Sequence, residues 1–482
     1  MTTTTHKSYR EWIHTAIGLV LMFGIPLLPP IEPITTTGMQ IGGIFIGAIY
    51  LWSMVGTFWP SLITVIALGF TDYTDMNSIL SAFSAYLPML MLFCMIFFGA
   101  IGDCGLTQYI GRWFLTRKII NGRPSVFNFV MMTAMFFVSA FIDPLMALLV
   151  LWPTLYLILE EVGYHKEDRY YRIMILATFM AIALGQCTLP FFGGQLIILG
   201  AFEAASGIAT NYGAYILFNI LVSLLAFLAI TLVIKFILRP DMSKMKDFSI
   251  EQINKNPLPP MNLQQKIYIF AAAVFLVAAL APSFLPANWK FVQFLSDLNL
   301  VGFTMLAIAI LAIIKVDGKP VLEPGRITKE YVSWDLYLLV VLAVYFSSCL
   351  MDDATGIQPW IVGILNPLFS GHSQMFFIIV LLIAGVILTN FANNGIVGAI
   401  MMQLIIAMAP SLGIEDPVPI AMTTTMCMFL AVLTPAASPY AAVLHANERV
   451  SMGDIMKYGL IMIAVSLVIF VVIGLPLASI LF

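Results

Sequence analysis

The chain has 482 residues, of which 61% are hydrophobic and only 10% are charged, and its formal net charge is −3. Soluble domains are about 25% charged, so this composition excludes a soluble globular protein and predicts an all-α protein that crosses a membrane many times. The five cysteines form no CxxC pair, so we interpret them as small packing residues rather than disulfides or metal ligands.

Apolar stretches long enough to cross a bilayer recur along the whole sequence. We expect about eleven transmembrane helices, and we interpret the first apolar run as a retained span because no small-residue cleavage site follows it. The expected spans are 14–30, 37–57, 58–71, 84–102, 173–200, 211–238, 265–287, 298–315, 334–351, 417–446 and 454–482.

Two further apolar tracts are interrupted midway by polar residues. The tract 125–158 is broken at Asp143-Pro144, where Asp would cap a second helix and Pro would begin it. The tract 374–410 is broken at Asn393-Asn394-Gly395, and the helix that follows would direct free N–H groups to the break. Irregular backbone at membrane depth occurs where it lines a wet cavity. Each tract therefore predicts a re-entrant hairpin with a polar tip.

The span after each hairpin is itself interrupted by Thr, Pro and small residues. The broken helices are expected at 173–200 and 417–446. Paired broken segments in matching places of two halves indicate the binding site of a secondary transporter. Tips and breaks that face one another would form one pocket near the midplane. The polar residues that we select from these breaks are Thr188, Gln195, Thr434 and Ser438.

Charge predicts the topology. If both hairpins enter and leave on one side, all of the 22 Lys and Arg residues except Lys290 fall on the side of the N-terminus, as the positive-inside rule requires. The N-terminus would then be cytoplasmic and the C-terminus extracytoplasmic. The first hairpin would open from inside and the second from outside, which is an inverted repeat. We place the first repeat at 1–238, a cytoplasmic linker at 239–264 and the second repeat at 265–482.

This layout resembles the divalent anion:sodium symporter family (dicarboxylate and citrate carriers) of the ion transporter superfamily. That family has Ser-Asn-Thr at each hairpin tip and a Thr-Pro-rich break in the next span. Here Asn394 matches the centre of the second tip motif and Thr434-Pro435 is close to the second break, whereas Asp143-Pro144-Leu145 matches the first tip motif at no position. Further likeness lies in Ser333-Trp334-Asp335 and Gly102-Asp103-Cys104-Gly105-Leu106.

The resemblance implies a transport domain that moves in an elevator fashion across a scaffold domain. It also implies a homodimer, and with the absence of organellar signals it places the chain in a bacterial inner membrane. The partners expected are a small-molecule substrate and the lipid bilayer, without nucleic acid. We expect no cofactor apart from Na⁺ or H⁺ as a coupling ion.

Asp143 has two interpretations that can coexist. It would cap the helix that starts at Pro144, and as an ionisable group at membrane depth it is a candidate for a cation, a proton or a substrate amine. The amides at the second tip can serve as caps or as ligands, and the hydroxyls of the breaks can bond freed carbonyls or solute. The substrate-binding candidates are Asn393, Asn394, Gly395, Asp143, Thr434, Ser438, Thr188 and Gln195. The coupling-cation candidates are Asp143, Asn394, Thr434 and Gly395.

No Lys or Arg falls at hydrophobic depth, so an anion would be held by half-helix N-termini, amides and hydroxyls, with help from a co-bound cation. We expect a secondary active transporter of a small organic anion, di- or tricarboxylate-like, working by cation-coupled symport or exchange. The alternative is a carrier of the same architecture for an amino-acid-like zwitterion, an oxyanion or Na⁺/H⁺ antiport. The sequence has no HExxH, GxSxG or Walker motif, so an enzyme is not expected.

Overall fold

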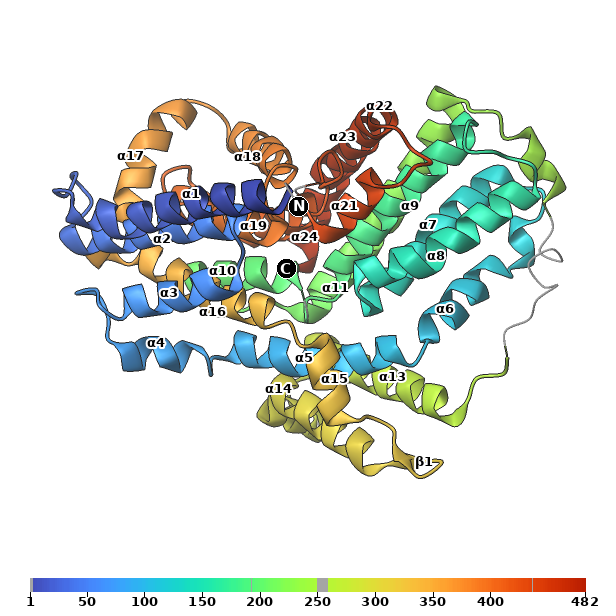
Figure 1. Cartoon of the computed structure of the whole chain (residues 1–482), viewed down its shortest axis with the longest axis horizontal. Helices are drawn as coiled ribbons and strands as arrows, with labels where there is room; N and C mark the ends of the chain where they lie inside the picture. Colours follow the sequence, from blue (N-terminus) through green and yellow to red (C-terminus); the bar gives the residue numbers. More distant parts are fainter. Residues whose placement is uncertain (1–2, 192, 249–258, 436) are drawn as a thin grey trace.

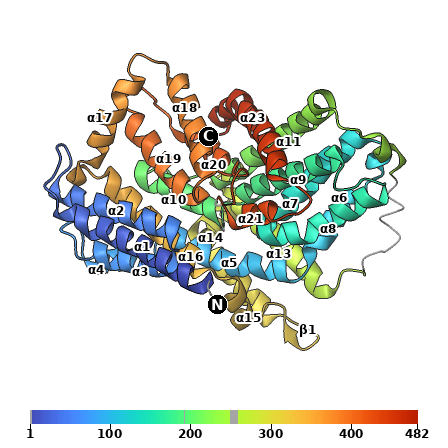
Figure 2. The same ribbon diagram turned by 45° about the horizontal axis from the view of Figure 1, so that its top comes forward.

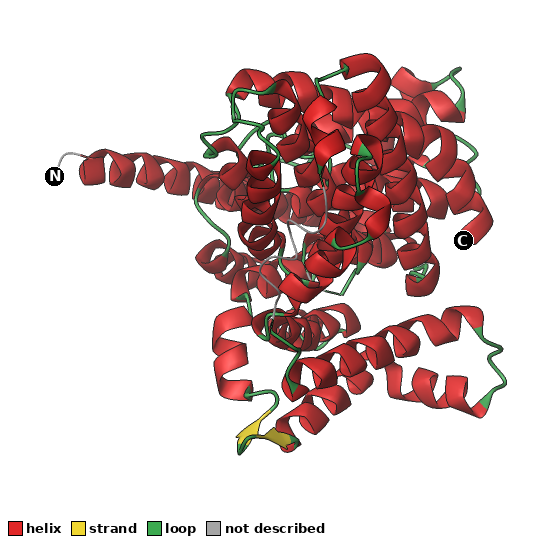
Figure 3. Cartoon of the chain, turned by 90° about the vertical axis from the view of Figure 1, so that its right-hand side faces the viewer, coloured by secondary structure: helices red, strands yellow, loops and turns green. Residues whose placement is uncertain are grey.

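A computed structural model describes residues 3–191, 193–248, 259–435 and 437–482. Within them the chain is almost entirely helical, as Figure 1 shows. The strands are β1 (Lys315–Val316) and β2 (Lys319–Pro320), which pair antiparallel. Figure 3 shows this small sheet at the edge of the molecule. Residues 249–258 of the predicted linker and the break residues 192 and 436 lie outside the described residues.

The first half contains both parts of the first predicted hairpin and the first broken span. In chain order its elements are α1 (Thr3–Gly24), η1 (Ile25–Leu27), α2 (Thr36–Met54), α3 (Phe58–Leu68), α4 (Met76–Ala82), α5 (Tyr86–Asp103), α6 (Leu106–Leu115), η2 (Lys118–Ile120), α7 (Pro124–Phe141), α8 (Pro144–Glu161), α9 (Arg169–Thr188), α10 (Gly194–Ser206), α11 (Tyr212–Val233) and η3 (Ile234–Leu238).

The second half repeats the order of a span, a hairpin, a broken span and a final span. Its elements, with the described part of the linker, are η4 (Ser243–Asp247), α13 (Leu263–Phe284), α14 (Lys290–Ile313), α15 (Pro324–Tyr331), α16 (Trp334–Met351), η5 (Asp353–Thr355), α17 (Ile357–Phe369), α18 (Gln374–Thr389), α19 (Asn394–Met408), α20 (Val418–Met428), α21 (Pro439–His445), α22 (Met452–Asp454), η6 (Ile455–Gly459), α23 (Leu460–Ile469), η7 (Phe470–Gly474) and α24 (Leu475–Leu481).

Nine helices of the described residues are long and apolar enough to cross a membrane, or ten if the bent pair α17 and α18 forms one span. The two arms of the first hairpin are among the nine. The expected spans near the N-terminus are shorter, because apolar helices cover 11–27 and 58–68. The described residues thus contain many helices of membrane length, as predicted. These nine helices do not correspond one by one to the eleven predicted spans.

The hairpins and broken spans of both halves share one hydrophobic core. This core joins residues of α7, α8, α9 and α11 to residues of α18, α20 and α23. We call these elements, with α10, α19, α21, α22 and α24, the hairpin body. Two other cores hold together α2, α3, α5, α13, α14 and α16, which with α1, α4 and α15 we call the frame. The positions of these elements can be followed in Figures 1 and 2.

Helix α10 lies on the boundary between the two bodies. Ile198 belongs to the core of the hairpin body, whereas Ile197 belongs to a core of the frame. Close packing at this boundary depends on glycine. A Cβ added to Gly200 would lie 2.8 Å from Cγ2 of Val344 on α16, and one added to Gly398 would lie 2.4 Å from Ile198. The start of α10 is thereby fixed between the frame and the second hairpin.

Candidate functional site

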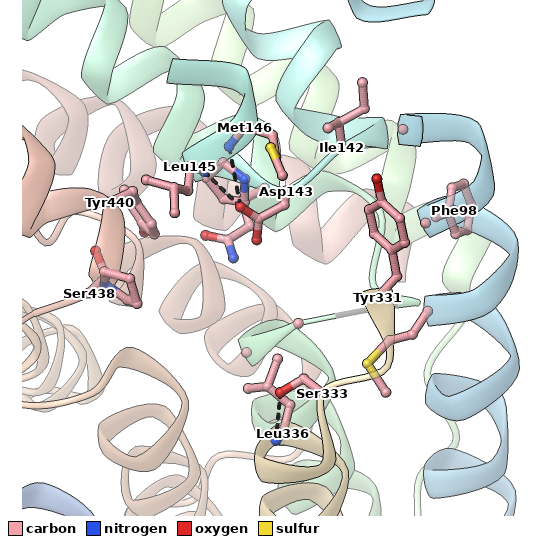
Figure 4. Close-up of a pocket in the computed structure, with 18 of the residues that line it drawn as sticks. Phe98, Ile142, Asp143, Leu145, Met146, Tyr331, Ser333, Leu336, Ser438 and Tyr440 are labelled. Carbon is pink, nitrogen blue, oxygen red and sulfur yellow. Dashed lines mark hydrogen bonds between the residues drawn. The ribbon is translucent and has the colours of Figure 1, made fainter. Parts of the chain in front are cut away.

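A cavity of about 570 Å³ lies where both hairpin tips and both helix breaks meet. Its wall includes Asp143 from the first tip and Asn393-Asn394-Gly395 from the second. The first break contributes Gln186 and Gly193-Gly194, and the second contributes Ser438. Figure 4 shows Asp143 and Ser438 around this space. Segments nearly 250 residues apart in the sequence therefore form one site.

Asp143 forms the first tip by capping α8. Its Oδ1 accepts hydrogen bonds from the backbone N–H groups of Leu145 (2.9 Å) and Met146 (3.4 Å), shown as dashed lines in Figure 4. Pro144 takes the first helical position, where its missing N–H costs little. The residue is exposed, so its carboxylate faces the cavity. Asp143 is thus both a cap and an available ligand.

Asn393 forms the second tip in the same way. Its Oδ1 accepts hydrogen bonds from the N–H groups of Gly395 (3.0 Å) and Ile396 (3.4 Å) at the start of α19. The next residue, Asn394, is only 6% exposed. It accepts a hydrogen bond from Thr389 at 3.1 Å and donates one to the hydroxyl of Tyr440 at 3.4 Å. The second tip is therefore tied to the second broken span.

The selected polar residues of the first break do not line the cavity. Thr188 donates a hydrogen bond to the carbonyl of Leu184 at 3.2 Å, and Gln195 donates one to the carbonyl of Leu189 at 2.7 Å. Both side chains are buried, with exposures of 2% and 0%. Gly193 has φ 105°, which a residue with a Cβ rarely adopts. Gln195 thus bonds a carbonyl that the break frees, whereas Thr188 bonds back to a carbonyl within α9.

The second break is held by Asn390. Its Oδ1 accepts hydrogen bonds from the N–H groups of Val432 (2.9 Å) and Leu433 (2.7 Å). Its amide nitrogen donates to the carbonyl of Leu430 at 3.1 Å, and its own carbonyl accepts from the hydroxyl of Thr434. Thr434 does not line the cavity. Ser438 does line it, and its Oγ caps α21.

The second tip packs directly on the start of α10. A Cβ added to Gly395 would lie 2.9 Å from Cδ1 of Ile197 and 3.4 Å from the carbonyl oxygen of Gly194. A side chain at Gly395 would therefore press on the end of the Ile197 side chain at the start of α10. Because α10 and α19 both begin here, their partial positive N-termini converge on one side of the cavity.

The charge in the cavity is single and negative. Asp143 is the one charged side chain among the described residues of the wall, and Lys, Arg and His do not contribute to it. No group of three or more His, Cys, Asp or Glu residues within the described ranges could hold a metal ion. The first tip therefore favours a cation, whereas the second offers amides and helix N-termini to an anion.

A family model described as the sodium:sulfate symporter transmembrane region matches residues 9–482. The chain belongs to this family. It is therefore a member of a family of membrane transporters rather than of enzymes, as the sequence predicts. The match extends over nearly the whole chain, so both hairpins and both breaks fall within the family's own region.

Curated relatives match a shorter part of the chain. The Na(+)/citrate cotransporters of Mus musculus and Rattus norvegicus are each 27% identical to it over 143 residues. This match covers 30% of the chain and 24% of each cotransporter, so it spans about a quarter of the length of these relatives. The crystal structure of the Alcanivorax borkumensis YdaH transporter has a similar fold, with a TM-score of 0.54 and 14% identity. That likeness covers 84% of this chain and 86% of the YdaH chain.

The wall of the cavity in this symporter-family chain also contains residues that the sequence does not predict as part of the site. These residues are Gln108 of α6, Tyr331 at the end of α15 and Ser333, which caps α16. Asp103 forms an ion pair with Arg326 of α15, and this hydrogen-bonded carboxylate raises the pKa of the Arg326 guanidinium above its ordinary value. Each of the two segments of family likeness in the sequence, 102–106 and 333–335, thus contributes to the wall, through Gly102, Gly105 and Ser333.

Proposed function

We propose that this chain is a secondary active transporter that couples the movement of a small organic anion to that of a cation, Na⁺ or H⁺. The observation that carries the proposal is the meeting of two capped hairpin tips around one cavity, where one cap is a carboxylate and the other an amide. Asp143 and Asn393 occupy matching positions, and each caps the helix that follows it.

The second tip is the seat for the anion. Asn394 keeps a backbone N–H at the first position of α19, and Asn393 keeps an amide nitrogen that its cap does not use. The start of α10 lies against Gly395, so two helix N-termini act on the same anion. Ser438 adds a hydroxyl at the wall. Helix N-termini and neutral donors can hold an anion without a cationic side chain.

The first tip is the seat for the cation. A carboxylate without a basic side chain in the same cavity is stabilised when a cation or proton joins it. Binding of an anion a short distance away becomes more favourable once this charge is neutralised, which couples the two events. Asn394, Gly395 and Thr434 remain the other coupling-cation candidates. We rank Asp143 first because the hydroxyl of Thr434 is already bonded to the backbone of Asn390.

Contacts between loops support the predicted topology. Tyr73 donates a hydrogen bond to Asp352 at 2.8 Å, and both residues are assigned to the outside. Arg172 pairs with Asp454 at 3.0 Å, and both are assigned to the inside. We propose that the N-terminus is cytoplasmic, the C-terminus is extracytoplasmic and the membrane is a bacterial inner membrane.

The separation of the hairpin body from the frame supports an elevator mechanism. The hairpin body is built around one hydrophobic core and the frame around two others, which take in residues of α10, α19 and α11 where the two bodies meet. We propose that the hairpin body carries the cavity across the membrane while the frame stays in place. The homodimer remains part of this proposal, with the frame as its interface.

Transport by purified protein in proteoliposomes tests the proposal. Asp143→Asn keeps the cap, because Asn and Asp cap equally well, but removes the charge. We expect anion uptake by the natural chain to rise with an inward Na⁺ or proton gradient, and this stimulation to disappear in Asp143→Asn. Asn393→Ser is the matched control, which changes the other cap and leaves the cation dependence intact. Undiminished stimulation in Asp143→Asn would overturn the cation site.

The exposed carboxylate of Asp143 also favours one alternative. It could pair with a substrate amine, so that the solute is a zwitterion and no coupling ion occupies the first tip. In that case Asp143→Asn would abolish uptake of an amino acid and leave uptake of the matching amine-free acid unchanged. An inorganic oxyanion such as the sulfate of the family description would use only the second tip.

A further inference from the structure

The wall of the cavity is chemically divided. Amides, glycine backbone and a hydroxyl gather at the second tip and the breaks, whereas the side of the first hairpin and α5 is apolar. Figure 4 shows several of these apolar side chains around Asp143. The apolar residues of that side are Met95, Phe98, Ile142, Leu145, Met146 and Val150.

The cavity offers one seat for a carboxylate rather than two. At the first tip the N–H groups of Leu145 and Met146 already bond to Asp143, and Pro144 has no N–H to give. At the second tip, Asn394 has a backbone N–H at the position that matches Pro144. The two tips thus differ at the first position of the helix, where the second tip has a backbone N–H that would bind an anion directly and the first tip has none.

A second carboxylate on the same solute would meet an unfavourable surface. On the side of the first tip it would find no free backbone donor, because the N–H groups of Leu145 and Met146 bond to Asp143, and the bound cation or proton is already matched by the charge of Asp143. Elsewhere on that side it would face side chains such as Met146 and Ile142, which cannot replace the water that a charge loses. The other polar side chains of the wall lie away from the first hairpin and α5: Gln186 belongs to the first break, and Gln108, Tyr331 and Ser333 come from α6, the end of α15 and the residue before α16.

Resting on the proposed function, we infer that the substrate carries one carboxylate and an apolar body, unlike a compact di- or tricarboxylate. The carboxylate lies at the second tip, and the apolar body lies against the first hairpin and α5. A cavity of about 570 Å³ falls within the range of sites for drug-sized ligands, which are mostly apolar with a few placed polar groups.

Met146 provides the sharpest test of the apolar side. It is 48% exposed and lines the cavity one turn after the first tip. Leu149, on the same helix, is 58% exposed but lies off the wall. Met146→Gln therefore makes the wall polar, and Leu149→Gln makes an equal change elsewhere on α8. Asp143 and its cap are untouched in both variants.

The experiment measures binding of 3-phenylpropanoate, succinate and citrate to the purified full chain by thermal shift, with Na⁺ present, and uptake of the same acids by proteoliposomes. We expect 3-phenylpropanoate to bind at least tenfold more tightly than succinate or citrate. We also expect Met146→Gln to weaken its binding about tenfold, and Leu149→Gln to leave it unchanged.

The outcomes separate the two proposals. Tighter binding of succinate or citrate, with 3-phenylpropanoate inert, would overturn the inference and leave the proposed function standing. Equal effects of Met146→Gln and Leu149→Gln would also overturn it, because the apolar wall would then not contact the solute. If the natural chain neither binds nor takes up any anion, both proposals fall.

Discussion

Oδ1 of Asn390 accepts a hydrogen bond from the backbone N–H of Leu433 at 2.7 Å, across the gap between the second hairpin and the second helix break. The same side chain also bonds to Val432 and Leu430. A single amide thus satisfies several backbone groups that the break removes from helical bonding, and each such group left unpaired would be costly in a buried site. Asn390 is 1% exposed, so water cannot take its place easily.

Replacing Asn390 should therefore damage the fold, whereas replacing Asn393 should damage function. Asn390→Ala leaves at least two buried N–H groups unpaired, and we expect a loss of roughly 3 kcal/mol or more in the free energy of unfolding. Asn393→Ala removes a cap, which costs about 1 kcal/mol, but takes an amide from the anion seat. Thermal denaturation and proteoliposome uptake distinguish the two effects. A larger stability loss in Asn393→Ala would contradict the assignment.

The packing of α9 on the first hairpin depends on Gly185. A Cβ at this position would lie 2.0 Å from Oγ of Ser139 and 2.3 Å from the carbonyl oxygen of Phe136, which is backbone and cannot rotate away. We expect Gly185→Ala to lower the free energy of unfolding by about 1–3 kcal/mol, the usual cost of overpacking, and to displace the first tip.

The matched control for Gly185 is Gly363→Ala on α17. A Cβ at Gly363 would meet nothing within 4 Å, and Ala favours a helix over Gly by about 1 kcal/mol. This variant should be neutral or slightly more stable. Scanning calorimetry of both variants in the same detergent provides the comparison, and a similar loss in both would show that the close approach is not what fixes α9.

The sequence predicts the positions of both tips because polar residues interrupt apolar tracts that are otherwise uniform. Asp143 and Asn393 fall at these interruptions and do reach the cavity. The sequence does not predict where a side chain points once the backbone leaves the helix, because the helical repeat then no longer fixes the directions of neighbouring side chains. For that reason the sequence predicts Thr188, Gln195 and Thr434 in the site, whereas in the structure all three side chains bond to backbone carbonyls away from the cavity wall.

The helices α6 and α17 are not predicted from the sequence, for a different reason. α6 has 10 residues and α17 has 13, and each lies between a span and a hairpin. Their length is below that of a membrane span, so the apolar runs do not stand out. Gln108 of α6 consequently reaches the cavity without having been a candidate. Tyr331 is not predicted either, because only the packing of α15 on α5, where Tyr331 lies against Gly99, brings it to the cavity.

Gln403 is a buried amide at the boundary between the two bodies. Among the described residues neither its nitrogen nor its oxygen has a hydrogen-bond partner, and it is 4% exposed. Its surroundings include Trp52 and Phe346 of the frame. We expect Gln403→Leu to raise the free energy of unfolding by about 1–3 kcal/mol, because the cost of an unpaired buried amide is removed.

Gln374 is the contrasting case for this prediction. Its Nε2 donates hydrogen bonds to the carbonyls of Leu412 (3.1 Å) and Gly413 (2.9 Å), so Gln374→Leu should lower the melting temperature while Gln403→Leu raises it. A lower melting temperature for Gln403→Leu would mean that its amide is satisfied by a group outside the chain, such as an ordered water.

Lys290 is the one Lys or Arg residue that the charge pattern of the sequence places on the outside of the membrane. It begins α14 and is exposed, as is Lys319 of the small sheet, which is assigned to the inside. In spheroplasts of an expressing bacterium, a membrane-impermeant amine reagent should label Lys290, and Lys290→Arg should abolish the signal. Lys319 should react only after the membrane is permeabilised. The reverse pattern, with Lys319 labelled before the membrane is permeabilised, would invert the predicted topology. Each hairpin would then open from the opposite side of the membrane, because both hairpins are placed relative to these same spans.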